Sequence, residues 1–222
     1  GGVFNRIMFA LRFRDSQILF TNAITAESRI LMYRSLNERL QKVAPFLLYD
    51  SDPYLAVVDG KLVWIVDAYT ATDRYPYSNP VSLSGTRQKI NYVRNSVKAV
   101  IDAYDGSIVL YVYDPYDPII RTWQGIFPAL FTPADEAPEQ LSTQIRYPMG
   151  LFLIQSEIYR TYHMSDPNTY YNEEDVWRLS TQASTGDINA YYLIMRLVGE
   201  EKAEFALIAP FMPVGRDNMI AW

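Results

Sequence analysis

The sequence predicts an α+β fold in which antiparallel β-hairpins form a sheet and helices pack on it. Asp-Gly pairs at 59–60 and 105–106 each lie between runs rich in β-branched and aromatic residues, which is the pattern of a hairpin. Apolar residues recur at helical spacing in two N-terminal segments and again after residue 139. The chain has 222 residues, which is enough to bury a substantial core.

Two helices are expected before the first strand. Apolar residues from Phe4 to Phe20 recur mostly at helical intervals. A second helix is expected from Ala26 to Ala44, because Thr25 and Ser28 offer a start signal and Pro45 ends it. Packing on a core is the favoured interpretation of both helices, and lying flat on a membrane surface is the alternative.

The first hairpin is expected from Tyr54 to Tyr69, with its turn at Asp59-Gly60. Both faces of this strand pair are apolar, so we expect cover on both sides. The expected cross-strand pairs are Val57 with Leu62 and Leu55 with Trp64 on one face, and Ala56 with Val63 and Tyr54 with Ile65 on the other.

The central hairpin begins near Val97 and is expected to turn at Asp105-Gly106 through a two-residue type I′ turn. That turn sets a register with one wholly apolar face. The pairs on this face are Ala103 with Ile108, Ile101 with Leu110, and Ala99 with Val112. A helix is expected from about Pro118, because Asp117 is a good N-cap and proline suits the first helical position.

The second half of the chain predicts a helix and a third hairpin. The helix is expected from Glu139 to Tyr162, kinked or divided at Pro148, and the hairpin from Tyr191 to Pro210. The Pro- and Glu-rich linker from Thr132 to Glu139 suggests a division into domains 1–131 and 140–222. One continuous domain is the alternative.

Composition excludes several functions. The net charge is −5 without a basic stripe, so nucleic acid is not an expected partner. The chain has no cysteine and one histidine, which removes thiolate catalysis, cysteine-ligated metals and histidine-pair zinc sites. No cofactor is expected, and no apolar run approaches the ~20 residues that span a bilayer. The chain begins at Gly1 without Met, so we expect it to be a piece of a longer protein.

Seven residues are candidates for ligand binding, and no catalytic residue or metal ligand is assigned. They come from the first two hairpins, from the polar loop 71–88 and from the segment before the helix at Pro118, since loops often carry function. The seven are Asp67, Asp73, Arg74, Tyr75, Asp102, Asp114 and Asp117.

Calcium binding, hydrolysis by carboxylates, histidine catalysis and contacts by exposed tyrosines each compete with an ordinary structural role. Asp114 and Asp117 could bind Ca²⁺ through oxygen, but turn and cap formation already explains both Asp-Pro pairs. Hydrolysis by paired carboxylates predicts that Asp102, Asp114 and Glu157 converge on a cleft. His163 follows a helix end, where capping or packing is favoured over catalysis. Exposed tyrosines could stack on sugars or contact a partner, namely Tyr75, Tyr77, Tyr113, Tyr116, Tyr170 and Tyr171.

Several longer sequence motifs resemble the UPF0182 family of uncharacterised multi-pass membrane proteins of bacteria and archaea. The resemblance covers nearly the whole chain and implies no catalytic residue. It implies a soluble region that follows about seven predicted membrane spans and lies outside the cytoplasm. The motifs are residues 50–54, 64–70, 73–78, 91–98, 162–164 and 216–222.

The favoured function is therefore an extracytoplasmic binding or scaffold domain of a membrane protein in the cell membrane, rather than an enzyme. Its expected partners are the membrane-spanning part of the same protein and other envelope proteins or sugars. A carbohydrate-binding or hydrolytic domain that uses carboxylates and tyrosines is one alternative. A Ca²⁺-stabilised interaction module is the other.

Overall fold

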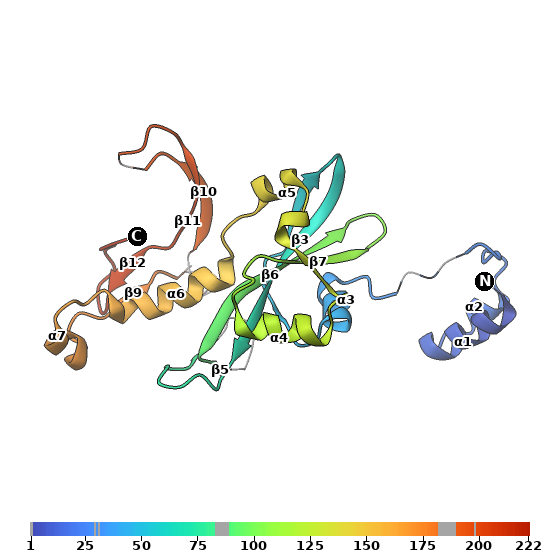
Figure 1. The fold of residues 1–222 in the computed structure, drawn as a ribbon, viewed down its shortest axis with the longest axis horizontal. Coiled ribbons are helices and arrows are strands. Elements are labelled where there is room, and N and C mark those ends of the chain that lie inside the picture. Colours follow the sequence, from blue (N-terminus) through green and yellow to red (C-terminus); the bar gives the residue numbers. More distant parts are fainter. Residues whose placement is uncertain (1, 29, 31, 83–88, 182–189, 198) are drawn as a thin grey trace. The chain divides into compact units, whose positions relative to one another are not determined.

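A computed structural model describes residues 2–28, 30, 32–82, 89–181, 190–197 and 199–222 (Figure 1). It is an α+β structure with antiparallel hairpins, as predicted. Contacts within the chain divide it into two units, Gly1–Pro45 and Phe46–Trp222. This boundary differs from the one suggested near Thr132–Glu139.

The first unit contains three short helices, α1 (Val3–Phe13), α2 (Gln17–Phe20) and α3 (Leu36–Val43). The helix expected from Phe4 to Phe20 is interrupted because Arg14 has a left-handed backbone with φ of 54°. Its N–H bonds back to Ala10, which closes α1.

The helix expected from Ala26 to Ala44 is wrong except for its last part, α3. The Ser28 hydroxyl accepts a hydrogen bond from the Thr25 N–H at 2.9 Å, a local bond that competes with helix formation. Tyr33 has a φ of 53°, outside the right-handed helical region. The Arg39 side chain donates to the carbonyl of Tyr33 and holds this bend.

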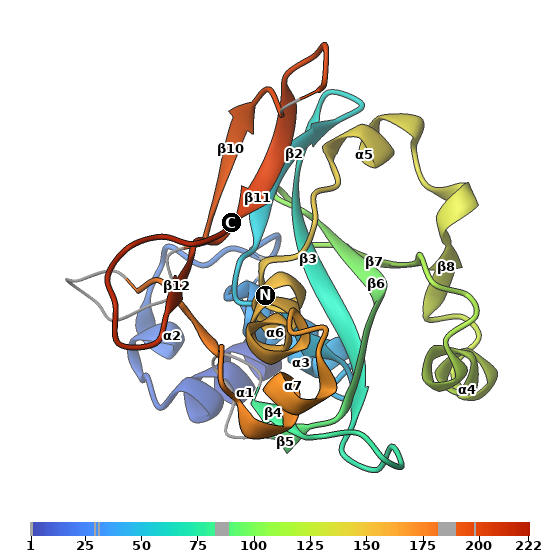
Figure 2. The same cartoon turned by 90° about the vertical axis from the view of Figure 1, so that its left-hand side faces the viewer.

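The second unit is built on a twisted six-stranded sheet in the order β1-β3-β6-β7-β8, with β2 also paired to β3 (Figure 2). Neighbouring strands are antiparallel except β7 and β8, which are parallel. The strands are β1 (Leu48–Tyr49), β2 (Tyr54–Val58), β3 (Lys61–Thr72), β6 (Tyr92–Asp102), β7 (Ile108–Val112) and β8 (Phe131–Pro133).

The first hairpin, β2–β3, is confirmed in turn and register. Asp59 and Gly60 both have positive φ, at 50° and 75°, as a type I′ turn requires. All four predicted cross-strand pairs are present. The expectation of cover on both sides is wrong at the free end of the hairpin, where Leu55, Val57 and Leu62 are between 50% and 56% exposed.

The central hairpin, β6–β7, keeps its predicted faces but not its register. Ile101 lies opposite Ile108 rather than Leu110, so four residues form the loop instead of two. The Asp102 carboxylate accepts hydrogen bonds from the N–H groups of Tyr104 and Asp105, which stabilises the longer loop. A shift of two residues leaves each side chain on its face, so Ala99, Ile101, Leu110 and Val112 of the predicted apolar face are buried, whereas Ala103 lies in the exposed loop.

Helices cover the sheet. α4 (Pro118–Ile126) starts at Asp117 as predicted and buries Ile120. The helix predicted from Glu139 to Tyr162 is divided before Pro148 into α5 (Glu139–Gln144) and α6 (Met149–Tyr162). Leu141 of α5 joins the core cluster formed by Ile65 and Tyr111 on the sheet.

The remaining elements are a third hairpin and several short segments. The third hairpin is present as β10 (Tyr191–Met195) and β11 (Glu204–Ile208). The other elements are β4 (Val81–Ser82), β5 (Lys89–Ile90), the 3-10 turn Ala134–Glu136, α7 (Pro167–Asn172), β9 (Trp177–Leu179) and β12 (Phe211–Pro213), and β9 pairs with β12. None of the helices in the described ranges is long and apolar enough to cross a membrane.

Candidate functional site

A buried ion pair occupies the middle of the sheet. Asp67 on β3 and Lys98 on β6 are cross-strand neighbours whose side chains are only 3% and 6% exposed. The Lys98 ammonium donates to the Asp67 carboxylate and, at 2.6 Å, to the Asn95 side-chain oxygen. Burial raises the pKa of Asp67 above its ordinary value, and the nearby Lys98 opposes that rise. The predicted ligand residue Asp67 is therefore engaged within the fold.

A second buried carboxylate, Asp50, ties α6 to the sheet. It accepts hydrogen bonds from the Tyr69 hydroxyl on β3 and from the Gly150 N–H in the first turn of α6, the latter at 2.9 Å. Tyr69 is fully buried, and burial together with the Asp50 charge raises the pKa of its hydroxyl. Asp50 thus positions the start of α6.

Arg146 joins three separate segments of the second unit. Its guanidinium forms an ion pair with Asp52 at 2.7 Å. It also lies over the rings of Tyr54 on β2 and Tyr192 on β10, at 4.0 and 4.4 Å from their centroids. Such cation–π contacts add to the ion pair and fix the segment before α6 and the third hairpin against the sheet.

The predicted candidate Asp117 is the buried N-cap of α4. One carboxylate oxygen accepts from the Tyr92 hydroxyl at 2.8 Å, and the other accepts from the hydroxyls of Ser96, at 2.7 Å, and Thr70. It also accepts from two backbone N–H groups of the helix. Burial alone would raise the pKa of Asp117, but these hydrogen bonds outweigh it and the pKa is lowered.

Two further candidates are linked to this cap. The Asp114 carboxylate pairs with Arg94 at 2.8 Å. The ring of Tyr75 stacks on Tyr92 with centroids 5.5 Å apart. The structure therefore brings Tyr75, Asp114 and Asp117 into one group through Tyr92 and Arg94.

The other two candidates of the first hairpin region, Asp73 and Arg74, are exposed neighbours after β3. Their side chains are 3.9 Å apart and are mostly in solvent. A pair of this kind in water contributes little to stability. Both charges therefore remain available to solvent, and the structure gives them no buried partner among the described residues.

Asp102 lies apart from this group. It borders a hollow of about 520 Å³ between the turns of the two hairpins, next to Leu62 and Tyr104. Asp114 follows the opposite end of β7, and Glu157 pairs with Arg160 on α6. Asp102, Asp114 and Glu157 do not converge on one cleft.

The described residues form neither a metal-binding site nor a catalytic site around His163. Among the described residues, no group of three or more acidic, histidine or cysteine side chains could hold a metal ion. His163 ends α6 and stacks on Trp177 with centroids 3.5 Å apart. Its ring nitrogen Nδ1 is 3.1 Å from the Tyr159 carbonyl, which agrees with the predicted capping and packing role.

Sequence reasoning missed Lys98 and Arg146 as partners of the acidic residues. A lone charge in an otherwise apolar strand was the available signal, because Asp67 and Lys98 each interrupt such a run. Nothing local pointed to Arg146, whose partners lie far away along the chain. The contacts of Asp52, Tyr54 and Tyr192 with Arg146 exist only in the folded unit.

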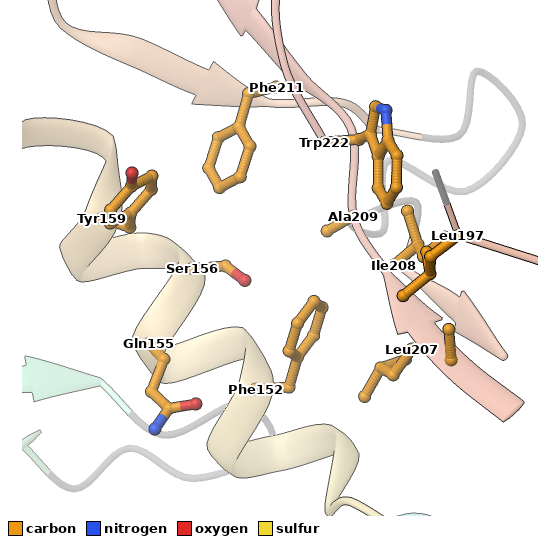
Figure 3. A pocket seen from close by; sticks show the side chains of 11 residues that line it. Phe152, Gln155, Ser156, Tyr159, Leu197, Leu207, Ile208, Ala209, Phe211 and Trp222 are labelled. Atoms are coloured by element: carbon orange, nitrogen blue, oxygen red, sulfur yellow. The ribbon is translucent and has the colours of Figure 1, made fainter. Parts of the chain in front are cut away.

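A further feature of the second unit is an apolar pocket between α6 and the segment from β11 to β12, which we call the α6–β11 pocket (Figure 3). Its volume is about 450 Å³, within the range of small-molecule sites. Its described lining residues are Phe152, Gln155, Ser156, Tyr159, Leu197, Ala206, Leu207, Ile208, Ala209, Phe211 and Trp222. No predicted ligand residue borders it.

The whole chain, residues 1–222, matches the model of the uncharacterised protein family UPF0182. A UPF0182 protein of Methanospirillum hungatei is 48% identical over 98% of this chain and 25% of its own length. One of Geotalea uraniireducens is 48% identical over 100% of this chain, and one of Trichodesmium erythraeum is 43% identical over 99%.

The chain spans about a quarter of the length of these relatives. No solved structure matches it. The sequence motifs quoted above and the match over the full chain agree, and so this chain belongs to the UPF0182 family.

Proposed function

We propose that this chain is an extracytoplasmic binding or scaffold domain of a multi-pass membrane protein. One observation carries the binding role: the buried candidates Asp67 and Asp117 are engaged by side chains of the fold itself, whereas large apolar side chains are left uncovered. Buried carboxylates whose oxygens already accept hydrogen bonds within the fold stabilise the structure and have few free acceptor sites for a substrate. Uncovered apolar groups are what a partner or ligand can bury.

One uncovered apolar surface lies on the first hairpin of the sheet. It is formed by Leu55, Val57 and Leu62, and we call it the β2–β3 stripe. Leu55 and Val57 are on one strand, and Leu62 is the cross-strand partner of Val57, so all three share one face. The proposed occupant is the membrane-spanning part of the same protein. Support comes from the length of the relatives, about four times that of this chain.

The location is tested by labelling an added cysteine. The chain has no cysteine, so Tyr104→Cys places one thiol on a residue that is 98% exposed. In intact cells that make the full-length protein with any cysteine outside this chain replaced by serine, a membrane-impermeant maleimide is expected to label this variant and not the same protein without the added cysteine. Labelling that appears only after lysis would contradict the extracytoplasmic location.

The binding role is tested by making the stripe polar with Leu55→Thr, Val57→Thr and Leu62→Thr together. Exposed substitutions each change the free energy of unfolding by about 0.5 kcal/mol or less, and threonine suits a strand. The melting temperature of the 222-residue chain should therefore change little, while that of the full-length protein should fall. An equal change in both would contradict a contact at the stripe.

A further inference from the structure

We propose that the α6–β11 pocket binds an uncharged, lipid-like molecule with a hydrocarbon body and one hydrogen-bonding oxygen at Ser156. This inference rests on the proposed binding function and names the chemical class of one ligand. It concerns a surface distinct from the β2–β3 stripe, since the two share no residue.

The lining of the pocket selects against charge. Among its described residues, none is acidic, basic or histidine, and most are aliphatic or aromatic. The pocket continues the apolar cluster of Leu179, Ala209 and Phe211 that fixes the end of the chain against α6. A charged ligand group placed there would lose its hydration without gaining a counter-charge. The body of the ligand is therefore neutral and apolar.

Ser156 supplies the polar contact. Its side chain is on the inner face of α6 and only 6% of the residue is exposed. Figure 3 shows its hydroxyl pointing into the pocket, between Phe152 and the strand segment that carries Ala209. The buried side-chain atoms that lack a hydrogen-bond partner among the described residues are His163 Nε2 and Trp177 Nε1, so the Ser156 hydroxyl is not an enclosed, unsatisfied group. It lies at the wall of the pocket, where a hydroxyl can donate to or accept from a ligand oxygen.

The volume sets the size of the ligand. A dry apolar cavity of about 150 Å³ holds benzene, so the 450 Å³ of this pocket corresponds to roughly 18 non-hydrogen atoms. The lining stripe Phe152, Gln155, Ser156 and Tyr159 on α6 covers about 10 Å of helix length. Ser156 lies within this stripe, which suits an elongated molecule whose oxygen is flanked by hydrocarbon on both sides.

Two fluorescent probes with the same aromatic body test whether the pocket prefers an uncharged ligand. N-phenyl-1-naphthylamine is neutral, and 8-anilinonaphthalene-1-sulfonate adds one negative charge. The 222-residue chain is titrated with each, and we expect the dissociation constant of the neutral probe to be at least tenfold lower. Equal affinity for both probes, or no binding of the neutral one, would overturn the proposal.

The hydroxyl is tested by competition with 6-dodecanol, an elongated alcohol whose oxygen has hydrocarbon on both sides, kept below its solubility limit. Dodecanol should displace the neutral probe, and Ser156→Ala should weaken dodecanol roughly three- to tenfold, the loss of one hydrogen bond, with the probe itself unaffected. Ser142→Ala on α5 is the matched control, since Ser142 is exposed and lies outside the pocket. An unchanged dodecanol affinity in Ser156→Ala would contradict the role of the hydroxyl.

The place of binding is tested by filling the pocket. Ala206→Phe adds a ring to the wall on β11, and Ala103→Phe adds the same ring to an exposed loop elsewhere. The first should abolish binding of the neutral probe, and the second should not. Retained binding in Ala206→Phe would overturn the assignment of the pocket. These results leave the cysteine labelling and the stripe variant untouched, so a failure here is distinguishable from a failure of the proposed function.

Discussion

Lys98 shows at the scale of one residue how a single charge is retained inside an apolar sheet. Its charge is balanced by Asp67 and it also donates to Asn95, and both side chains of the ion pair are almost fully buried. Removing one partner of such a pair leaves a buried charge unpaired. The ion pair in the middle of the sheet therefore stabilises the fold and is not a free binding site.

Lys98→Met is expected to lower the free energy of unfolding by about 3–5 kcal/mol, measured by urea denaturation. Adding Asp67→Leu should recover most of that loss, since the unpaired carboxylate is then gone as well. Arg74→Met is the control in the exposed pair with Asp73, and should change stability by about 0.5 kcal/mol or less. A similar loss for Lys98→Met and Arg74→Met would contradict the burial argument.

Asp117 makes a pH-dependent contribution at the same scale. Its folded-state pKa is lowered from the ordinary 3.8, so its stabilisation is present above the unfolded-state pKa and is lost as pH falls through the folded value. Asp117→Asn should therefore be destabilised most at neutral pH, by about 2–4 kcal/mol for the cap and its buried donors. The difference from the unmodified chain should shrink below pH ~4.

Asp166, the N-cap of α7, is the matched control for Asp117 because it is also followed by proline but is exposed. Thermal unfolding across pH should show a smaller effect of Asp166→Asn than of Asp117→Asn at neutral pH. Equal effects would mean that the hydroxyl donors Thr70, Ser96 and Tyr92 add nothing to the cap.

At the scale of elements, short sequence patterns predicted the turns that are determined by local hydrogen bonds and backbone angles. The turn at Asp59-Gly60 requires two positive φ values, and the residues that best accept them were visible in the sequence. The turn at Asp105-Gly106 carried the same signal, but the side chain of Asp102 stabilised a longer loop. The Asp-Gly pair alone therefore does not show whether a neighbouring side chain favours a longer loop.

Contacts between distant segments could not be predicted in this way. Arg146 contacts Asp52, 94 positions away in the sequence, and also Tyr192 of the third hairpin. The α6–β11 pocket draws on residues from 152 to 222, and no single stretch carries its pattern. Of the seven predicted ligand residues, Tyr75, Asp114 and Asp117 are grouped by Tyr92 and Arg94, which sequence spacing did not indicate.

The start of α6 gives a prediction at the element scale. A Cβ atom at Gly150 would lie 2.9 Å from an Asp50 oxygen and 3.2 Å from the Tyr69 hydroxyl. Gly150→Ala is therefore expected to destabilise the chain by about 1–3 kcal/mol through overpacking. Gly125→Ala in α4 meets nothing within 4 Å and should stabilise by about 0.4–1 kcal/mol. Urea denaturation of both variants checks the opposite signs.

For the whole molecule, the chain combines a well-connected polar interior with apolar surface that it does not cover itself. The charged groups Asp50, Asp67 and Asp117 hold the second unit together, and the β2–β3 stripe and the α6–β11 pocket remain open. This distribution is the basis of the binding role that we propose. The relatives are about four times as long as this chain, and the partner that we propose for such a surface is another part of the same polypeptide.

Photo-crosslinking in the full-length protein tests the binding role most directly. A benzoylphenylalanine in place of Val57 reports on the β2–β3 stripe, and one in place of Tyr171 on α7, which is 86% exposed, serves as the control. Irradiation followed by mass spectrometry should join position 57, and not position 171, to the membrane-spanning part of the same protein. No crosslink from position 57, or equal crosslinks from both positions, would contradict the proposal that this chain works by contact with that part.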